Sequence, residues 1–510
     1  VIAGFGEAAG LASSSGCDGV EVNAGQHSLV RQFLSGLTNH RGDDWGADKL
    51  RFASEVLAAV RAAAGDAAVV GLRLSCDELA PWAGITPDAA AEIAVALCES
   101  IDYLTVVRGS IYSVSATRPD THVEPGFNRD LCRQIRSALP AGVAVVMQGS
   151  MVDVDMAEAA IADGTADAIE MTRAQIADPD LAAKVAAGDA NRVRPCILCN
   201  QTCQVRDNRN PLVSCVVEPS AGHESEDQPV PLSRELGGAS LHLLVVGAGT
   251  AGLECARVAA LAGFRVTVVE RRRSTGGMIR IAAGASGRYR LSLIAAWLLQ
   301  ECEQLGVGIE LGVDAGIDRI EAHNEPVVIC TGARPGERAY PVRPGATVLN
   351  PEEVLSNAAI VPEGPVAVWD PIGGPVAVSV AETLRASGRD VTLISPDVVV
   401  GTQLSRSGDL APANVRLQSS DVELVRRARI DEVTSGEVRV SDIFSAETRA
   451  LDASALVDCG ARLPEDRLWR TSGEHLPRAG DAVAPRTVYE AILEGRRAAQ
   501  QLARMAPAAR

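Results

Sequence analysis

A glycine-rich turn between two apolar runs constrains this chain most strongly. The stretch LHLLVVGAGTAGLECARVAALAGFRVTVVE (241–270) has the pattern of a buried strand, a tight turn, a helix and a second strand. Gly247 would form the turn, Gly249 would let the backbone approach a pyrophosphate, and Gly252 would let the helix pack on the strand. Glu270 ends the second strand, where it could accept hydrogen bonds from ribose hydroxyls. The segment therefore predicts a dinucleotide-binding α/β domain.

Four cysteines precede this turn in a short polar segment. Cys196, Cys199, Cys203 and Cys215 follow the spacing C-x2-C-x3-C-x11-C, on a segment too short to form its own core. Four thiolates suit either an iron–sulfur cluster or structural zinc. Zinc ligands usually come as two separated pairs, whereas three cysteines cluster here and one stands apart, which favours iron–sulfur. The other eight of the twelve cysteines are expected to be buried thiols, and a disulfide framework is not expected because nothing suggests secretion.

Length and composition narrow the class of protein. A chain of 510 residues should hold two or three domains, and 47% hydrophobic residues exclude a disordered chain. The formal net charge of -17 argues against nucleic acid and anionic membranes as partners. No apolar run reaches the length of a membrane-spanning helix. The opening VIAGFGEAAGLASSSG has an acid and no basic region, unlike a signal peptide, so a cytoplasmic protein is expected.

The first 190 residues alternate short apolar runs with Ala-rich amphipathic segments. Strands are expected at 19–24, 68–75, 102–109, 143–150 and 166–173. Buried strands joined by crossover helices predict a parallel β/α (TIM) barrel. A closed barrel has eight such units and only five are found, so about three units are expected to be missing before the first residue, through truncation or a misplaced start. The alternative is that a partner chain supplies them.

Catalytic groups of such barrels collect where the strands end. Asn23 and Gln26 follow the first strand, and Arg73 lies within the second. The last two loops are predicted to bind phosphate, with Gly149 and Ser150 in one and Arg173 in the other. A buried Arg73 needs an anionic or accepting partner. The electron-rich edge of a flavin would serve, and a structural ion pair is the alternative.

Several of these stretches together resemble a known family. GCDGVEVNAGQHSLVRQFLSGLTNHRGDDWG, GLRLS and ADAIEMTRAQIADPDL are similar to the second half of the flavin barrel of the old yellow enzyme family. With the cysteine segment and the nucleotide domain, the whole chain resembles the multi-cofactor branch, which includes enzymes of the 2,4-dienoyl-CoA reductase and trimethylamine dehydrogenase types and mycofactocin-associated oxidoreductases. The resemblance implies FMN in the barrel, a 4Fe-4S cluster on the four cysteines, and FAD or ADP in the C-terminal module.

The chain departs from the family pattern at the catalytic positions. Where relatives read H-x-x-H-x-Y, this chain has Asn23, Gln26 and Ser28, so the usual substrate-orienting pair and the tyrosine are altered. Asn23 and Gln26 can still donate hydrogen bonds. Tyr112 and His122 lie in the loop where relatives keep further catalytic groups, and they are the predicted substitute acid and base. The alternative for this pair is a packing tyrosine and a surface histidine.

Three further segments resemble FAD-binding domains of flavoprotein disulfide reductases. RRRSTGGM contains Gly277, VVICTGARP contains Gly332, and PRAGDAVAPRTVYEAILEGRRAA contains Asp481, whose counterpart contacts the flavin ribityl chain. Between them, GPVAVWDPIGGPVAVSVAETLRASGRDVTLISP (364–396) has the rhythm of a nicotinamide-nucleotide site. Its turn, however, places Asp370 at the first glycine position and Pro375 at the third, which argues against NAD(P)H binding there.

The predicted organisation is a partial FMN barrel (1–190), an iron–sulfur segment (191–220), a linker (221–240), an FAD/ADP-binding Rossmann domain (241–360 and 461–510) and an NAD(P)-type insert (361–460). We expect electrons to pass between FAD, the cluster and FMN. The enzyme would use NAD(P)H to reduce an activated alkene, or it would oxidise an amine and pass electrons to a carrier protein. A non-catalytic electron-relay subunit is the third alternative. A small-molecule substrate and a homo-oligomer are also expected.

Overall fold

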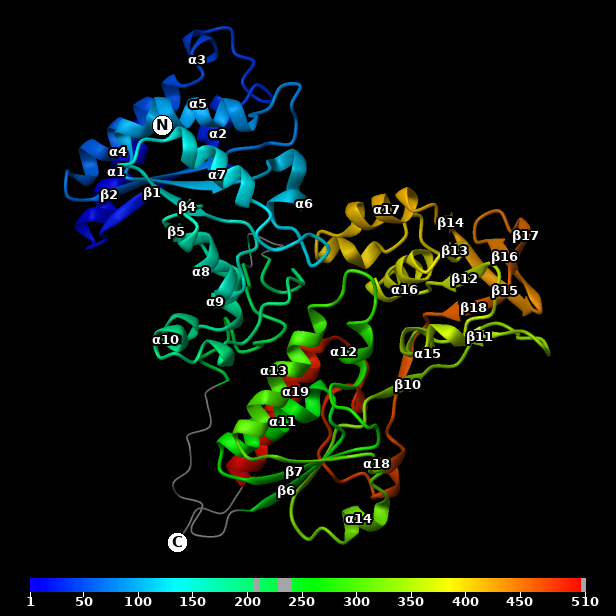
Figure 1. Cartoon of the computed structure of the whole chain (residues 1–510). Coiled ribbons are helices and arrows are strands. Elements are labelled where there is room, and N and C mark those ends of the chain that lie inside the picture. Colours follow the sequence, from blue (N-terminus) through cyan, green and yellow to red (C-terminus); the bar gives the residue numbers. More distant parts are fainter. Residues whose placement is uncertain (205–208, 210, 228–240, 506–510) are drawn as a thin grey trace. The chain divides into compact units, whose positions relative to one another are not determined.

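The computed structural model describes residues 1–204, 209, 211–227 and 241–505 (Figure 1). They form two compact units. The first comprises Val1–Pro119 and Val123–Gln175, and the second comprises Asp120–His122 and the chain from Ile176 onward. Of the predicted linker, 228–240 lies outside the described residues. Among the described helices, none has the length and hydrophobicity that crossing a membrane requires.

The first unit is a parallel sheet with helices between its strands. The strands pair in sequence order, which confirms the predicted β/α arrangement. They are β1 (Gly19–Ala24), β2 (Val69–Ser75), β3 (Tyr103–Val107), β4 (Ala144–Met147) and β5 (Ala168–Ile169). The helices are α1 (Ile2–Ser14), α2 (Leu29–Leu34), α3 (Asp44–Ala47), α4 (Arg51–Ala64), α5 (Pro87–Leu97), α6 (Val114–Thr117), α7 (Arg129–Ala138) and α8 (Val154–Ala162), and α9 (Thr172–Ala177) ends the unit.

The two faces of this sheet differ in chemistry. Val70, Leu72 and Leu74 of β2 are fully buried in the core that the helices share, together with the apolar side of α4. The alternate residues of β2, including Arg73, point to the other face, because neighbouring side chains of a strand lie on opposite sides. This second face is polar, and of the predicted site residues it carries Asn23 and Arg73.

The second unit begins with α10 (Leu181–Ala186) and the cysteine segment, followed by a four-stranded parallel sheet. The order is β8 (Gly308–Leu311), β7 (Arg265–Glu270), β6 (His242–Val246), β9 (Val327–Ile329). Figure 1 shows α11 (Thr250–Leu261), α13 (Leu291–Gln304) and α19 (Val488–Met505) side by side against this sheet. Shorter helices are α12 (Gly277–Ala282), α14 (Ile317–Glu321) and α18 (Arg467–Thr471).

The insert within this unit has a parallel sheet of its own. The order is β11 (Val348–Leu349), β18 (Ala455–Asp458), β12 (Val366–Trp369), β13 (Val391–Ile394), β14 (Glu423–Val425). Its helices are α15 (Pro351–Ser356), α16 (Pro375–Ala386) and α17 (Leu410–Ser419). An antiparallel meander follows, of β15 (Ala428–Thr434), β16 (Gly436–Asp442) and β17 (Thr448–Ala453). The chain enters and leaves the insert through the paired strands β10 (Ala333–Pro335) and β19 (Arg462–Pro464).

Candidate functional site

The glycine turn after β6 has the geometry of a dinucleotide site. Gly247 adopts φ +108° and donates its N–H to Val269 O, and Gly249 is the N-cap of α11. A Cβ added to Gly249 would meet no described atom within 4 Å, whereas one added to Gly252 would lie 1.9 Å from Gly247 O. The second glycine therefore leaves room for a ligand, and the third is needed for the packing of helix on turn.

Segments far apart in the sequence meet at this turn. Gly276 donates its N–H to Ala248 O at 2.8 Å, and a Cβ on Gly277 would come within 3.1 Å of Gly249 Cα. A Cβ on Gly480 would lie 2.7 Å from the Cβ of Ala251, near the start of α11. Each glycine permits an approach that a side chain would block.

Two carboxylates, those of Glu270 and Asp481, lie near the glycine turn. Glu270 is buried at the end of β7, and its Oε2 accepts the N–H of Ala248 at 2.8 Å. Asp481 follows Gly480, and burial raises the pKa of its carboxyl above the ordinary value. Gly332, with φ +81°, follows β9, the strand beside β6. The structure thus collects the predicted dinucleotide residues of the second unit at the carboxyl end of one parallel sheet.

The cysteine segment brings its four thiols together. Burial, with the nearby thiols of Cys203, Cys196 and Cys215, raises the pKa of Cys199 well above its ordinary value. All twelve cysteines are free thiols. Leu198 and Asn200 both adopt left-handed backbone, with φ +53° and +52°, so the chain reverses tightly beside Cys199. Soft donors beside this reversal, with the thiol of Cys215 near them, fit a tetrathiolate metal site.

A buried charge network fastens this segment to the FAD-type helices. The guanidinium of Arg194 lies over Trp297 of α13, 4.6 Å from the ring centroid. Burial and the neighbouring Arg257 lower the pKa of Arg194 to about 9. Arg290 Nη2 donates to Cys196 O at 2.8 Å. Sequence reasoning missed this network, because nothing in the local pattern around these arginines shows where their partners lie.

In the first unit, Arg73 is paired with two carboxylates. Its Nε donates to Glu21 Oε1 at 2.7 Å and its Nη2 donates to Glu170 Oε2 at 2.6 Å. Thr105 donates to the other oxygen of Glu21. The structure therefore confirms the alternative that Arg73 forms a structural ion pair. Contact between Arg73 and a flavin stays a prediction.

The predicted phosphate-binding residues lie together. Arg173 Nη2 donates to Ser150 Oγ at 2.6 Å, although the two residues follow different strands. Gly149 and Ser150 have φ +139° and +55°, and a Cβ on Gly149 would meet Asn128 at 2.9 Å. Asn128 donates to Gln148 O, while its buried Oδ1 has no partner among the described residues. A cation, a hydroxyl and an unusual backbone turn fit an anionic phosphate.

The residues at the end of β1 and just after it play distinct roles. Asn23 is exposed, and its Oδ1 accepts the N–H of Gly25 at 2.7 Å. Gln26 Nε2 donates to Arg108 O at 3.3 Å, which ties the end of β1 to the loop after β3. Ser28 is the N-cap of α2 and accepts the N–H of Arg31. A serine at this position thus stabilises a helix start.

Tyr112 lines a cavity of about 330 Å³ in the first unit. Its wall also includes Trp82 and Leu79, and the side chains of Tyr112 and Trp82 are 68% and 78% exposed. Buried Glu78 forms part of the wall, where its carboxylate is held by Arg31, Ser35 and Ile85 N–H. Tyr112 therefore stands at a largely aromatic and apolar cavity, and its proton-donating role stays a prediction.

His122 belongs to the second unit and is buried. Its Nδ1 lies 2.9 Å from Asp120 Oδ1 and 3.9 Å from Asp409 Oδ2, and its Nε2 lies 3.8 Å from Glu382 Oε2. Its side chain is 8% exposed, so the surface-histidine alternative is wrong. A role as catalytic base stays a prediction.

The second turn, after β12, differs from the expected alignment. Asp370 directly follows β12, as predicted, but Gly374 is the N-cap of α16 and Pro375 is its first residue. The placement of Pro375 at the third glycine position is therefore wrong, because this turn is two residues longer than the turn after β6. Proline is tolerated at the first helical position, where its missing N–H leaves no internal bond unmade.

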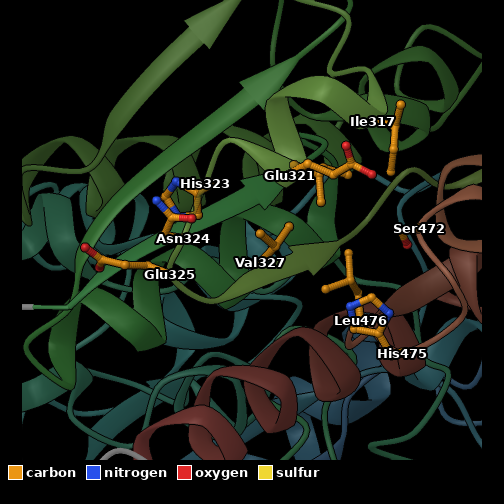
Figure 2. Close-up of a pocket in the computed structure, with 10 residues that line it drawn as sticks. Ile317, Glu321, His323, Asn324, Glu325, Val327, Ser472, His475 and Leu476 are labelled. Atoms are coloured by element: carbon orange, nitrogen blue, oxygen red, sulfur yellow. The ribbon is translucent and has the colours of Figure 1, made fainter.

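A second cavity, of about 350 Å³, lies in the FAD-type domain (Figure 2). His323, Asn324 and Glu325 line it just before β9, and His475 and Leu476 line it from the segment before the last helix. The strands β6 and β9 are parallel, and the glycine turn follows β6. Residues that precede β9 therefore lie at the amino ends of the strands, opposite the glycine turn. This cavity is therefore separate from the dinucleotide site.

Comparison with known proteins gives two family matches. Residues 1–191 match the NADH:flavin oxidoreductase / NADH oxidase family, and residues 241–484 match the pyridine nucleotide-disulphide oxidoreductase family. The first match covers the barrel unit and the second covers the glycine turns.

Individual proteins are similar over nearly the whole chain. The metal reductase of Desulforamulus reducens is 31% identical over 96% of this chain and 78% of its own length. The probable N-methylproline demethylase of Rhizobium meliloti is 30% identical over 98% of this chain and 78% of its own. The solved structure of a 2-naphthoyl-CoA reductase superposes with a TM-score of 0.88 and 27% identity, covering 98% of this chain and 75% of that one.

Proposed function

Because this chain belongs to the NADH:flavin oxidoreductase family, in the branch that also carries a pyridine nucleotide-disulphide oxidoreductase domain, we propose that it oxidises an N-methylated amine. It is an FMN-dependent flavoprotein oxidoreductase. The proposal adds the substrate class, a 4Fe-4S cluster and an electron-carrier protein as acceptor.

The negative charge on the polar face of the sheet in the first unit is the observation that favours an amine as substrate. Glu21 and Glu170 oppose one guanidinium, that of Arg73, which leaves one excess negative charge. A protonated amine is attracted by such a face, whereas a substrate with a net negative charge, such as a CoA thioester with its phosphates, is repelled. The similarity to an N-methylproline demethylase agrees with this choice.

The residues present fit the cofactors that this function needs. Bound FMN would supply a hydride acceptor, and a cluster on the four cysteines would supply one-electron transfer. Ser150 and Arg173 would hold the FMN phosphate. Cys196, Cys199, Cys203 and Cys215 would hold the cluster, and the Gly247–Gly252 turn with Glu270 would hold FAD or ADP.

The polar side chains near the strand ends would orient the amine. In the overall reaction the ammonium would lose its proton to solvent and a hydride from the methyl carbon to the flavin, and water would hydrolyse the resulting iminium to formaldehyde and the demethylated amine. Asn23 is exposed at the end of β1 and would accept a hydrogen bond from the amine. Gln26, anchored on Arg108 O, would fix the edge of the pocket.

Anaerobic mixing of the reconstituted holoenzyme with different electron donors tests the proposal. Sarcosine and N-methylproline are expected to bleach the flavin absorbance, whereas NADH and NADPH are not. Bleaching by NADH or NADPH without any response to amines would refute it. A holoenzyme that none of these donors reduces would also contradict it and would favour the relay-subunit alternative.

Reduction of an activated alkene is the second candidate, and the cavity at Tyr112 favours it. An exposed phenol on an apolar, aromatic wall suits proton donation to a flat conjugated substrate. The likeness to a 2-naphthoyl-CoA reductase points the same way. Chemically reduced holoenzyme would then be reoxidised by an α,β-unsaturated acid, and more slowly in Tyr112→Phe.

A further inference from the structure

The two nucleotide-type turns of the second unit are built on the same backbone frame. Gly247 donates its N–H to Val269 O at 2.8 Å, and Asp370 donates its N–H to Ile394 O at 2.8 Å. In each case the bond joins the first turn residue to the neighbouring parallel strand. Asp370 therefore occupies the place that Gly247 has in the first turn.

The side chain of Asp370 takes the donors that a phosphate would use. Its Oδ1 accepts the N–H of Gly373 at 2.9 Å and that of Ile372 at 3.3 Å. The residue is 1% exposed, and its buried Oδ2 has no partner among the described residues. In dinucleotide sites the N–H groups of this turn point at the pyrophosphate. Here the chain's own carboxylate lies against them.

The side chains of Thr402 and Asp397 pack against Gly373 of the second turn. A Cβ added to Gly373 would lie 2.4 Å from Thr402 Oγ1 and 2.6 Å from Asp397 Oδ2. Gln403 donates its backbone N–H to Gly373 O and its side-chain amide to Ile372 O. Gly374, which is the N-cap of its helix as Gly249 is of α11, is open, because a Cβ there would meet only Ile372 Cγ2, at 3.8 Å. The second carboxylate, that of Asp397, lies against Gly373, whose N–H Asp370 already binds.

The insert also differs from the first turn at the position of Glu270, the predicted ribose-binding residue. Glu270 follows Val269, which accepts the N–H of Gly247, whereas Ser395 follows Ile394, which accepts the N–H of Asp370. Ser395 is fully buried and its hydroxyl accepts the N–H of Asp397. The second turn therefore lacks the acidic side chain that would bind the ribose hydroxyls of NADH, so the exclusion of NADPH rests on Asp370.

We infer that Asp370 closes the nucleotide turn of the insert, so that this domain rejects NADH and NADPH despite its dinucleotide-type fold. The carboxylate of Asp370 would face the pyrophosphate, with that of Asp397 beside Gly373, and like charges brought together in a poorly solvated turn repel strongly. Electrons would then not enter the protein from a nicotinamide at this turn. The inference concerns binding, and it stands whether or not an amine is the substrate.

Binding of NADH and NADPH to the FAD-loaded holoenzyme tests it, because the first turn is then filled. Nucleotide fluorescence and equilibrium dialysis would give the affinity without depending on turnover. Asp370→Gly places at this position the residue type that the first turn has in Gly247, and it removes the charge. We therefore expect the variant to bind NADH and NADPH at least about tenfold more tightly than wild type does. Asp370→Asn is the matched variant. It loses the charge but keeps an oxygen on the turn, so its affinity should lie between the two.

Two outcomes would overturn the inference. One is a wild-type protein that binds NADH as tightly as Asp370→Gly does. The other is a pair of variants with native circular dichroism and bound FAD that bind neither nucleotide better than wild type. If Asp370→Gly fails to fold, the comparison of Asp370→Asn with wild type decides, since equal affinities would show that the charge does not exclude the nucleotide.

Discussion

Glu254 on α11 and Arg496 on α19 form a buried ion pair, with Nε 2.9 Å from Oε1. The same guanidinium also binds Glu218, which follows the last cysteine of the segment. Arg257 donates to both oxygens of Glu254. One carboxylate thus joins two helices of the FAD-type domain, and Arg496 extends the link to the cysteine segment.

Glu254→Gln should destabilise the protein by about 3 kcal/mol at pH 7, because buried Arg257 loses its counter-charge and buried Arg496 is left with Glu218 alone. Although burial alone would raise it, Arg257 and Arg496 lower the pKa of Glu254 to about 2 from an ordinary 4.5. A carboxyl with a lowered folded-state pKa contributes stability that is complete above pH 4.5 and is lost as the pH falls toward 2.

Urea unfolding at pH 7, 4 and 3 tests this account. The difference in the free energy of unfolding between variant and wild type should become smaller as the pH falls. Glu310→Gln, in the exposed pair with Arg319, is the control, and its effect should stay below about 1 kcal/mol. A difference that does not change with pH would contradict this account.

Gly249→Ala and Gly252→Ala should separate binding from folding at the first turn. The methyl group of Gly249→Ala has room in the protein but would block the approach of a pyrophosphate, so FAD binding should be lost with stability nearly unchanged. In Gly252→Ala the methyl group would collide with Gly247 O, and we expect a loss of about 2 kcal/mol as well as of FAD. Flavin content and thermal unfolding measure the two effects. Retention of FAD by Gly249→Ala would argue against this turn as the site.

Cys199→Ser should abolish iron incorporation. Anaerobic reconstitution of the wild type is expected to give about four irons and four sulfides per chain, as a 4Fe-4S cluster requires. Loss of one thiolate from the group of four should prevent this. Cys132→Ser, at a buried thiol on α7 outside the segment, is the matched control and should keep its iron. Zinc in place of iron in the wild type would support the alternative metal.

Arg73→Leu should destabilise the first unit by about 2 kcal/mol, since it leaves Glu21 and Glu170 facing each other without a counter-charge. Adding Glu21→Gln to Arg73→Leu should restore part of the loss, with a coupling of about 1 kcal/mol. Urea unfolding of the wild type, both single variants and the double variant gives this coupling. FMN retention in the double variant is a separate readout, and loss of FMN there would show that Arg73 also serves the flavin. Strictly additive effects would refute the ion-pair account.

Much of the fold could be predicted because its signals are local. Gly247, Gly249 and Gly252 report backbone requirements of one turn, and the cysteine spacing reports the ligand needs of one loop. The alternation of apolar runs and amphipathic helices likewise predicted the parallel sheet of the first unit. Each of these patterns is complete within about 30 residues of sequence, and the backbone decides its geometry.

What the sequence could not determine are the partners of charged side chains and the length of one turn. Arg73 satisfies its charge with residues 52 and 97 positions away, and Glu254 pairs with a residue 242 positions away. Pro375 was misplaced because only the hydrogen bonds of Asp370 and Gly374's position at the helix start reveal two extra turn residues. The sequence by itself determined the parallel sheets, the first glycine turn and the four-cysteine segment, because these are properties of short backbone stretches. Only the tertiary structure decided that Asp370 lies on its own turn and that carboxylates hold Arg73, because long-range packing selects which charges meet.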